Sequence, residues 1–178
     1  MFIHWGVYSC YGGVYNGRNS ARYAEWILNN ESIPLDEYEA VAKDFTPEAY
    51  DPEAWAQAAL EAGIKYVVIT SKHHDGFALF PSAYSTWSIA DHSTWGKDLI
   101  GPLAEACRKR GIRFGLYYSH AIDWVNGGAQ SEKHFSAAGR TPVDYDHYLQ
   151  TISLPQTEEI LDRYHPDILW WDMPSGMN

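Results

Sequence analysis

Cysteine is scarce in this chain: Cys10 and Cys107 are the two that occur, and they lie far apart. Two isolated cysteines imply neither a disulfide framework nor a zinc ribbon. No apolar run approaches the roughly 18 residues that a membrane-spanning helix needs. The opening residues 1–6 lack the basic and apolar regions of a signal peptide. We therefore expect no membrane partner, and the cellular compartment stays open.

Positive charge is also scarce, with 13 Lys and Arg against 23 Asp and Glu and a net charge of −10. The basic run Arg108-Lys109-Arg110 fits a solvated helix face, so we expect no nucleic-acid partner. The sequence also lacks a Ser-His-Asp nucleophile elbow and a glycine-rich phosphate loop. Nucleotide binding is therefore disfavoured.

Aromatic residues are abundant. They make up 15% of the 178 residues, with 8 Trp and 13 Tyr, while 46% of residues are hydrophobic and 20% are charged. This composition is typical of a globular domain with a real core. The aromatic surplus exceeds what such a core needs, and it fits a cleft that stacks on carbohydrate or other rings.

A repeated unit organises the chain: a helix, a glycine or turn, an apolar strand and then a polar cluster, recurring about every 50 residues. We expect strands at 2–6, 64–70, 112–118 and 168–173, helices at 34–43, 52–62, 98–110, 145–152 and 157–165, a compact or helical stretch at 21–27, and loops at 7–19, 71–97 and 119–142. The apolar run 168–173 is typical of a strand that is buried on both faces.

Strands that alternate with helices predict right-handed crossovers and a parallel α/β sheet. Four such strands would form either about the first four units of a (β/α)8-type barrel or a small open sheet, and spacing does not separate the two. The chain opens directly on an expected strand and closes soon after another. We therefore expect residues 1–178 to be a partial barrel, truncated at both ends.

Polar residues follow each expected strand: His4, His73-His74-Asp75, Tyr117-Tyr118-Ser119-His120 and Asp172. In either architecture the C-terminal ends of parallel strands meet at one crevice, so we expect these groups to converge. Alternatives remain for each group. Asp172 could cap a helix or form a salt bridge, and His4 could be a hydrogen-bonded core histidine. His73 and His74 cannot both point the same way from an extended strand, so at least one is expected to support the other.

Metal binding is a further alternative, because several of these residues are of types that bind zinc or iron: His4, His73, His74, His120 and Asp172. No pair has the close His-x-His or His-x-x-x-His spacing of a preformed site. Glu25-Trp26 is also ambiguous. It is either a helix residue with its packing neighbour, or a hydroxyl acceptor beside a ring-stacking wall.

A series of short motifs runs along nearly the whole chain: Phe2-Ile3-His4-Trp5-Gly6, Glu25-Trp26, Phe45-Thr46-Pro47, Lys72-His73-His74-Asp75-Gly76-Phe77, Trp87-Ser88, Gly115-Leu116-Tyr117-Tyr118-Ser119 and Leu169-Trp170-Trp171-Asp172. Together, and in this order, they resemble the α-L-fucosidases of glycoside hydrolase family 29. The Lys-His-His-Asp-Gly-Phe block is the most specific of them.

The resemblance implies a retaining exo-glycosidase that hydrolyses terminal α-L-fucosides of a fucosylated oligosaccharide or glycoconjugate, with no cofactor and no metal. By position Asp172 matches the nucleophile. The residues that match those holding the fucose are His4, Glu25, Trp26, His73, His74 and Tyr117. Tyr118 is the alternative to Tyr117, because the two alternate faces of a strand.

The family pattern is incomplete in this chain. The family's acid/base lies on a later strand or loop, and its C-terminal β-sandwich is absent too. Asp123 and Glu132 lie in expected loops without a supporting pattern, so neither is a convincing substitute. These residues alone are therefore not expected to turn over a fucoside efficiently. Two other functions stay open: a non-catalytic sugar-binding barrel and a metal-dependent hydrolase. Linkage preference and oligomeric state also stay open.

Overall fold

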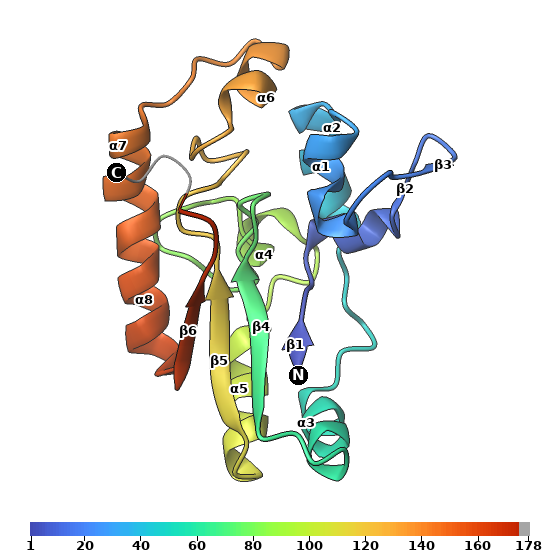
Figure 1. Cartoon of the computed structure of the whole chain (residues 1–178), viewed down its shortest axis with the longest axis vertical. Coiled ribbons are helices and arrows are strands. Elements are labelled where there is room, and N and C mark those ends of the chain that lie inside the picture. Colours follow the sequence, from blue (N-terminus) through green and yellow to red (C-terminus); the bar gives the residue numbers. More distant parts are fainter. Residues whose placement is uncertain (175–178) are drawn as a thin grey trace.

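The expected strands assemble into one parallel sheet. The computed structural model describes residues 1–174, and within them a four-stranded sheet contains, side by side in this order, β1 (Phe2–Ile3), β4 (Tyr66–Lys72), β5 (Arg113–Tyr118) and β6 (Ile168–Trp171). All neighbours pair in parallel, and the arrows in Figure 1 point the same way. Spatial order follows chain order without reversal. A barrel is wound in this way, whereas an open doubly wound sheet reverses its order at a switch point.

The helices of the repeated unit form the outer layer. These are α3 (Pro52–Glu61), α5 (Ile100–Lys109) and α8 (Leu154–Tyr164), and α5 contacts both of the others as well as β4 and β5. The start of α3 follows from its sequence: the Asp51 carboxylate accepts a hydrogen bond from the Ala54 amide at 2.9 Å, and Pro52 occupies the first turn. Gly63, with φ of 73°, follows its end. No helix in residues 1–174 is long and apolar enough to cross a membrane.

Strand residues alternate between the helix layer and the opposite face. In β4 and β5 the core formed with the helices includes Val67, Ile69, Phe114, Leu116 and Tyr118. Tyr117 points the other way, where its ring contacts that of Phe2, and Phe2 in turn contacts the ring of Trp170. Gly115 lies on this face as well, and a Cβ there would come within 2.9 Å of Ile168 Cβ. The glycine therefore lets β5 and β6 approach each other closely.

Several short elements lie in segments expected to be loops or only approximately placed: η1 (Val7–Tyr11), β2 (Val14–Tyr15), β3 (Arg18–Asn19), η2 (Ala24–Trp26), α1 (Ile27–Asn30), α2 (Leu35–Val41), η3 (Ala42–Asp44), α4 (Ile89–His92), α6 (Glu132–Ala137), α7 (Tyr145–Tyr148) and the π-helix η4 (Leu149–Ser153). The loop predictions for 7–19, 71–97 and 119–142 are therefore each wrong in part. Elements this short carry too few residues for a periodic pattern. In Figure 1, α1, α2 and α6 lie beyond the arrowheads of the central strands.

The prediction that residues 168–173 are buried on both faces is wrong for this structure. Within residues 1–174, β6 has a neighbouring strand on one side only, so it forms the edge of the sheet. Trp170 and Trp171 are consequently 49% and 53% exposed. An apolar run shows what a strand can bury, but only its neighbours decide how much is covered.

Candidate active site

Asp172 directly follows β6 and lies at the C-terminal edge of the sheet. Its Oδ2 accepts a hydrogen bond from the Tyr117 hydroxyl at 2.7 Å, and its Oδ1 accepts one from the Met173 amide at 2.8 Å. Nε2 of His74 lies 3.5 Å from the same Oδ2. Asp172 therefore faces the histidines across the end of the sheet, as the convergence of strand ends predicts.

The surroundings of Asp172 keep its carboxylate ionised. Partial burial raises the pKa of this carboxyl, but hydrogen bonds from the Tyr117 hydroxyl and the Met173 amide, together with the charges that His74 and His4 carry when protonated, lower it more. The net result is a pKa below the ordinary value, because each of these groups stabilises the charged form. The side chain remains 34% exposed, so the anion is open to a ligand.

His73 and His74 both reach the site. The prediction that strand alternation would separate them is wrong, because β4 ends at Lys72 and the two histidines follow in a turn. Their ring centroids lie 4.3 Å apart. His73 stacks on Tyr117 at 5.2 Å with an interplanar angle of 10°, while His74 faces Asp172.

A register shift at the end of β4 determines the faces to which the last side chains of this strand point. Thr70 pairs with Tyr117, but Lys72 pairs with Tyr118, so β4 carries one extra residue, Ser71, between them. Such a bulge reverses the alternation of faces beyond it. Lys72 therefore points toward the helix layer together with Tyr118, which leaves the opposite face to the histidines.

Both histidines are neutral at neutral pH. Burial lowers the pKa of His73 well below its usual value, and His74 and His4 lower it further. Burial also lowers the pKa of His74 to about 4, against the opposing effect of Asp172. Neutral imidazoles offer one donor and one acceptor each, which suits the recognition of hydroxyl groups.

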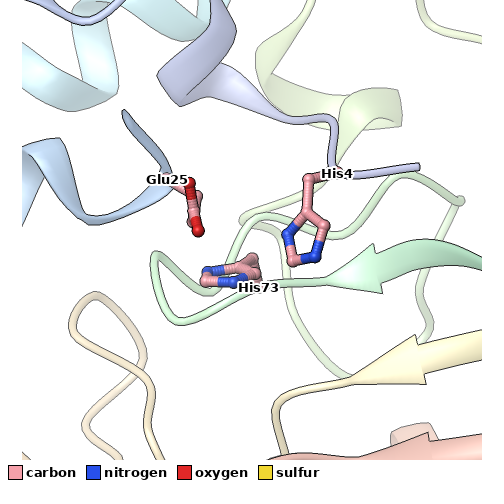
Figure 2. A group of neighbouring side chains, drawn as sticks. All are labelled: His4, Glu25 and His73. Carbon is pink, nitrogen blue, oxygen red and sulfur yellow. The ribbon is translucent and has the colours of Figure 1, made fainter. Parts of the chain in front are cut away.

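His4, Glu25 and His73 converge from three separate segments (Figure 2). Each offers one ligand atom, and the three atoms lie within 4.8 Å of one another. His4 follows β1, Glu25 lies in η2 and His73 follows β4. Nδ1 of the buried His73 has no hydrogen-bond partner within residues 1–174. An unpaired polar atom in such a place favours a ligand that completes it.

Trp26 forms an aromatic wall next to these groups. Its ring lies edge-on to His74 at 4.9 Å and to the buried Trp124 at 5.2 Å. Trp26 itself is only partly buried, so part of its surface is open to a ligand. The structure thus brings all the predicted site residues together: Asp172, His4, Glu25, Trp26, His73, His74 and Tyr117.

The two adjacent tyrosines point to opposite faces of β5. Tyr117 contacts Asp172, whereas the Tyr118 hydroxyl lies 2.9 Å from Gln156 Oε1 on the helix side. His120 also lies apart from the histidine cluster, since its ring stacks on Trp171 at 4.9 Å. Of the residues considered as metal ligands, the cluster contains His4 and His73 but not His74, His120 or Asp172, and it adds Glu25.

A buried ion pair supports the site and was missed in the sequence. Nζ of Lys72 lies 2.9 Å from Oδ2 of Asp123 and 2.8 Å from the Tyr148 hydroxyl, and both charged side chains are 0% exposed. Gly76 approaches this pair so closely that a Cβ there would collide with the Asp123 and Asn126 side chains. One signal was available: a lysine that ends a buried apolar strand needs a buried anion.

The geometry combines an ionised carboxylate, neutral imidazoles, a second carboxylate and an indole wall in one open site. Such a set can bind a polyhydroxylated ring through its hydroxyls and its apolar face, and it can present an anion to an electrophilic carbon. The His4, Glu25 and His73 atoms also match the His₂Glu donor set of some zinc sites. The chemistry of the donors alone does not separate a sugar from a metal.

Comparison with known proteins identifies the family of the chain. A family model described as Alpha-L-fucosidase matches residues 1–178. The tissue alpha-L-fucosidase of Rattus norvegicus is 35% identical over 188 residues, and the match covers 99% of this chain. That of Homo sapiens is 32% identical over 186 residues, covering 98% of this chain.

Solved structures agree with this match. The unliganded alpha-L-fucosidase from Lactobacillus casei superposes with a TM-score of 0.90 at 36% identity over 99% of this chain. The alpha-L-fucosidase from Vibrio sp. strain EJY3 gives a TM-score of 0.87 at 37% identity over 97%. The parallel sheet thus corresponds to part of a catalytic barrel, which confirms the predicted fold class.

The chain is shorter than these relatives. It spans 39% of the length of the rat protein and 38% of the human one. It spans 59% of the Lactobacillus casei chain and 30% of the Vibrio chain.

Proposed function

Because the chain belongs to the α-L-fucosidase family, glycoside hydrolase family 29, we propose that it provides the nucleophile and most of the sugar pocket of a retaining exo-glycosidase. Its substrates would be terminal α-L-fucosides. The observation that carries this proposal is the Asp172 carboxylate, held ionised by Tyr117 at 2.7 Å and open at the edge of the sheet.

In the first step an oxygen of Asp172 attacks the anomeric carbon and forms a glycosyl-aspartate ester. The bond to the leaving oxygen breaks, and a general acid supplies the proton that this oxygen needs. Water then attacks the same carbon while the conjugate base of that acid takes its proton, and the ester opens to release the Asp172 carboxylate, so two displacements retain the configuration. Tyr117 and the Met173 amide stabilise the carboxylate before attack and after release.

The residues around Asp172 would recognise the sugar. His4, Glu25 and His73 present a cluster of hydrogen-bonding atoms to its hydroxyls, and Trp26 would cover its apolar part. Each missing hydroxyl would leave a partner such as His73 Nδ1 unpaired, which gives selectivity beyond shape.

Structures of the Lactobacillus casei relative hold alpha-L-fucose product and Fuca(1,6)GlcNAc. Both matches cover 99% of this chain at 36% identity. These complexes support a fucosylated oligosaccharide or glycoconjugate as the substrate class here.

The acid/base would come from a segment beyond Asn178, so that residues 1–178 act as the N-terminal half of the catalytic domain. Two carboxylates near the site are already engaged. Asp75 accepts from Tyr38 at 2.7 Å, Asp123 pairs with Lys72, and both are buried. A retaining enzyme needs its acid/base about 5–5.5 Å from the nucleophile. Residues 1–178 expressed alone would therefore not hydrolyse an aryl α-L-fucoside efficiently, and robust turnover by them would contradict this part of the proposal.

The decisive experiment replaces the nucleophile in the full-length protein. Asp172→Ala should abolish hydrolysis of an aryl α-L-fucoside, and added azide should restore part of the turnover as a glycosyl azide. Asp162→Ala, at an exposed position of α8, is the matched control and should leave activity unchanged. Unchanged activity in Asp172→Ala would exclude the nucleophile role. A wild-type protein that binds fucose without any turnover would instead support a non-catalytic sugar-binding barrel.

A further inference from the structure

Ser119 directly follows β5 and contacts the imidazole of His74. Ser119 is 1% exposed, and its Oγ lies 2.6 Å from Nδ1 of His74 and 2.7 Å from the carbonyl oxygen of Ile122. Its backbone amide donates to the Lys72 carbonyl at 3.0 Å. Both its main chain and its side chain are therefore held in place.

The positions of the protons on Ser119 and His74 follow from which atoms can donate and which can only accept a hydrogen bond. The Ile122 carbonyl can only accept, so the single hydroxyl proton of Ser119 points to it. Nδ1 of His74 must then carry a proton that it donates to Ser119 Oγ. Burial lowers the pKa of His74 to about 4, so at neutral pH the ring holds one proton only. Nε2 is consequently bare.

We infer that Ser119 is a positioning residue that holds His74 in the Nδ1–H tautomer, so that a bare Nε2 faces the substrate beside Asp172. Nε2 and Asp172 Oδ2 lie 3.5 Å apart and are both acceptors. A hydroxyl of the sugar next to the reacting carbon would supply the missing donor. This inference rests on the proposed function for the identity of that ligand, but not for the tautomer.

The opposite tautomer would impair the site in two ways. Asp172 Oδ2 already accepts one hydrogen bond from Tyr117, and an Nε2–H would donate a second one to the same oxygen, which would occupy the lone pair needed for attack. It would also remove the acceptor that the sugar hydroxyl requires. The Ser119 hydroxyl prevents both by taking the histidine proton on the other side of the ring.

Nitrogen NMR of the full-length protein, labelled with ¹⁵N-histidine, tests the tautomer directly. The His74 signals are identified by their loss in His74→Asn. In the wild type we expect a protonated-type shift for Nδ1 and a bare, pyridine-type shift for Nε2 between pH 6 and 8. A protonated Nε2 in the wild type would overturn the inference, whatever the variants do.

Ser119→Ala tests the role in the reaction. It should give a mixture of His74 tautomers and lower kcat/KM by roughly tenfold or more, the loss typical of a hydrogen bond in a binding site. Ser153→Ala is the matched control, because its buried hydroxyl also donates to a carbonyl, that of His120 at 2.6 Å, without touching an imidazole. It should change neither the tautomer nor kcat/KM.

Ser119→Cys, which is nearly the same size as the wild-type residue, replaces the alanine variant if that variant does not fold. Its kcat/KM should lie between those expected for the wild type and for Ser119→Ala. An unchanged tautomer or an unchanged kcat/KM in the Ser119 variants would overturn the inference, as would an equal loss in Ser153→Ala. Failure of the proposed function is distinguishable, because Asp172→Ala would then retain activity while the His74 tautomer is as inferred.

Discussion

The hydroxyl of Tyr117, on β5, donates a hydrogen bond of 2.7 Å to Oδ2 of Asp172, which follows the neighbouring strand β6. This contact joins the ends of two strands that are 55 residues apart in sequence. It stabilises the charged carboxylate and fixes the direction of one of its oxygens. The geometry therefore couples the ionisation of Asp172 to a single neighbouring hydroxyl.

Tyr117→Phe should lower kcat/KM for an aryl α-L-fucoside by roughly 10- to 100-fold, since hydrogen bonds to charged groups have this weight. It should also shift the acidic limb of the kcat/KM profile to higher pH, because losing the donor raises the pKa of Asp172. Tyr118→Phe is the control on the opposite face of β5 and should leave the acidic limb unmoved. An unmoved limb in Tyr117→Phe would contradict the coupling.

Lys72→Met should destabilise the protein by about 3–5 kcal/mol, because it leaves the Asp123 carboxylate buried without its cation. Lys72→Met/Asp123→Leu should cost less than the sum of the two single changes, since no charge is then stranded. Urea unfolding measures both, with Lys65→Met as the exposed control. Additive effects would show that the two side chains do not stabilise each other.

The titration of Asp75 should make the free energy of unfolding decrease as pH rises from about 4 to about 7. Burial raises the pKa of Asp75 to about 7, against about 3.9 in an unfolded chain. Between these two pH values the native state holds a proton that the unfolded state has lost. The contribution of Asp75 to the free energy of unfolding is therefore complete below about pH 4 and disappears as pH rises to about 7. Asp75→Asn keeps an acceptor for Tyr38 but cannot titrate.

Urea unfolding at pH 5 and pH 8 checks this sign. Relative to Asp75→Asn, the wild type should lose on the order of 2 kcal/mol between the two pH values. The comparison removes effects common to both proteins, including the opposite contribution of His74, whose lowered pKa favours the native state above pH 6.5. Asp162→Asn should follow the wild type. Parallel wild-type and Asp75→Asn curves would refute the prediction.

Chelation separates the sugar site from a metal site. The proposed reaction uses no metal, so EDTA should leave kcat/KM unchanged. Added Zn²⁺ should inhibit competitively with the fucoside, because His4, Glu25 and His73 offer the donors that zinc prefers. Mg²⁺, which prefers oxygen ligands, is the control and should not inhibit. Loss of activity with EDTA and its return with Zn²⁺ would favour the metal-dependent hydrolase instead.

The sequence alone determined the repeated helix–strand unit and the edge at which its polar residues would meet. Residues 64–70 and 112–118 are β-branched or apolar runs with glycine or turn signals before them, and these are local properties. Asp172 and the two histidines follow such runs, so parallel pairing necessarily brings them to one edge. The family motifs then added Glu25 and Trp26, which no strand pattern would have joined to that edge.

Only the tertiary structure decided the directions in which individual side chains point. The register shift near Ser71 turned Lys72 toward Asp123, and the end of β4 freed both histidines from strand alternation. The exposure of Trp171 and the proton on His74 likewise depend on which groups lie beside them. Periodicity reports the faces of an element, whereas a contact between distant segments depends on register, turns and neighbours, which no local pattern encodes.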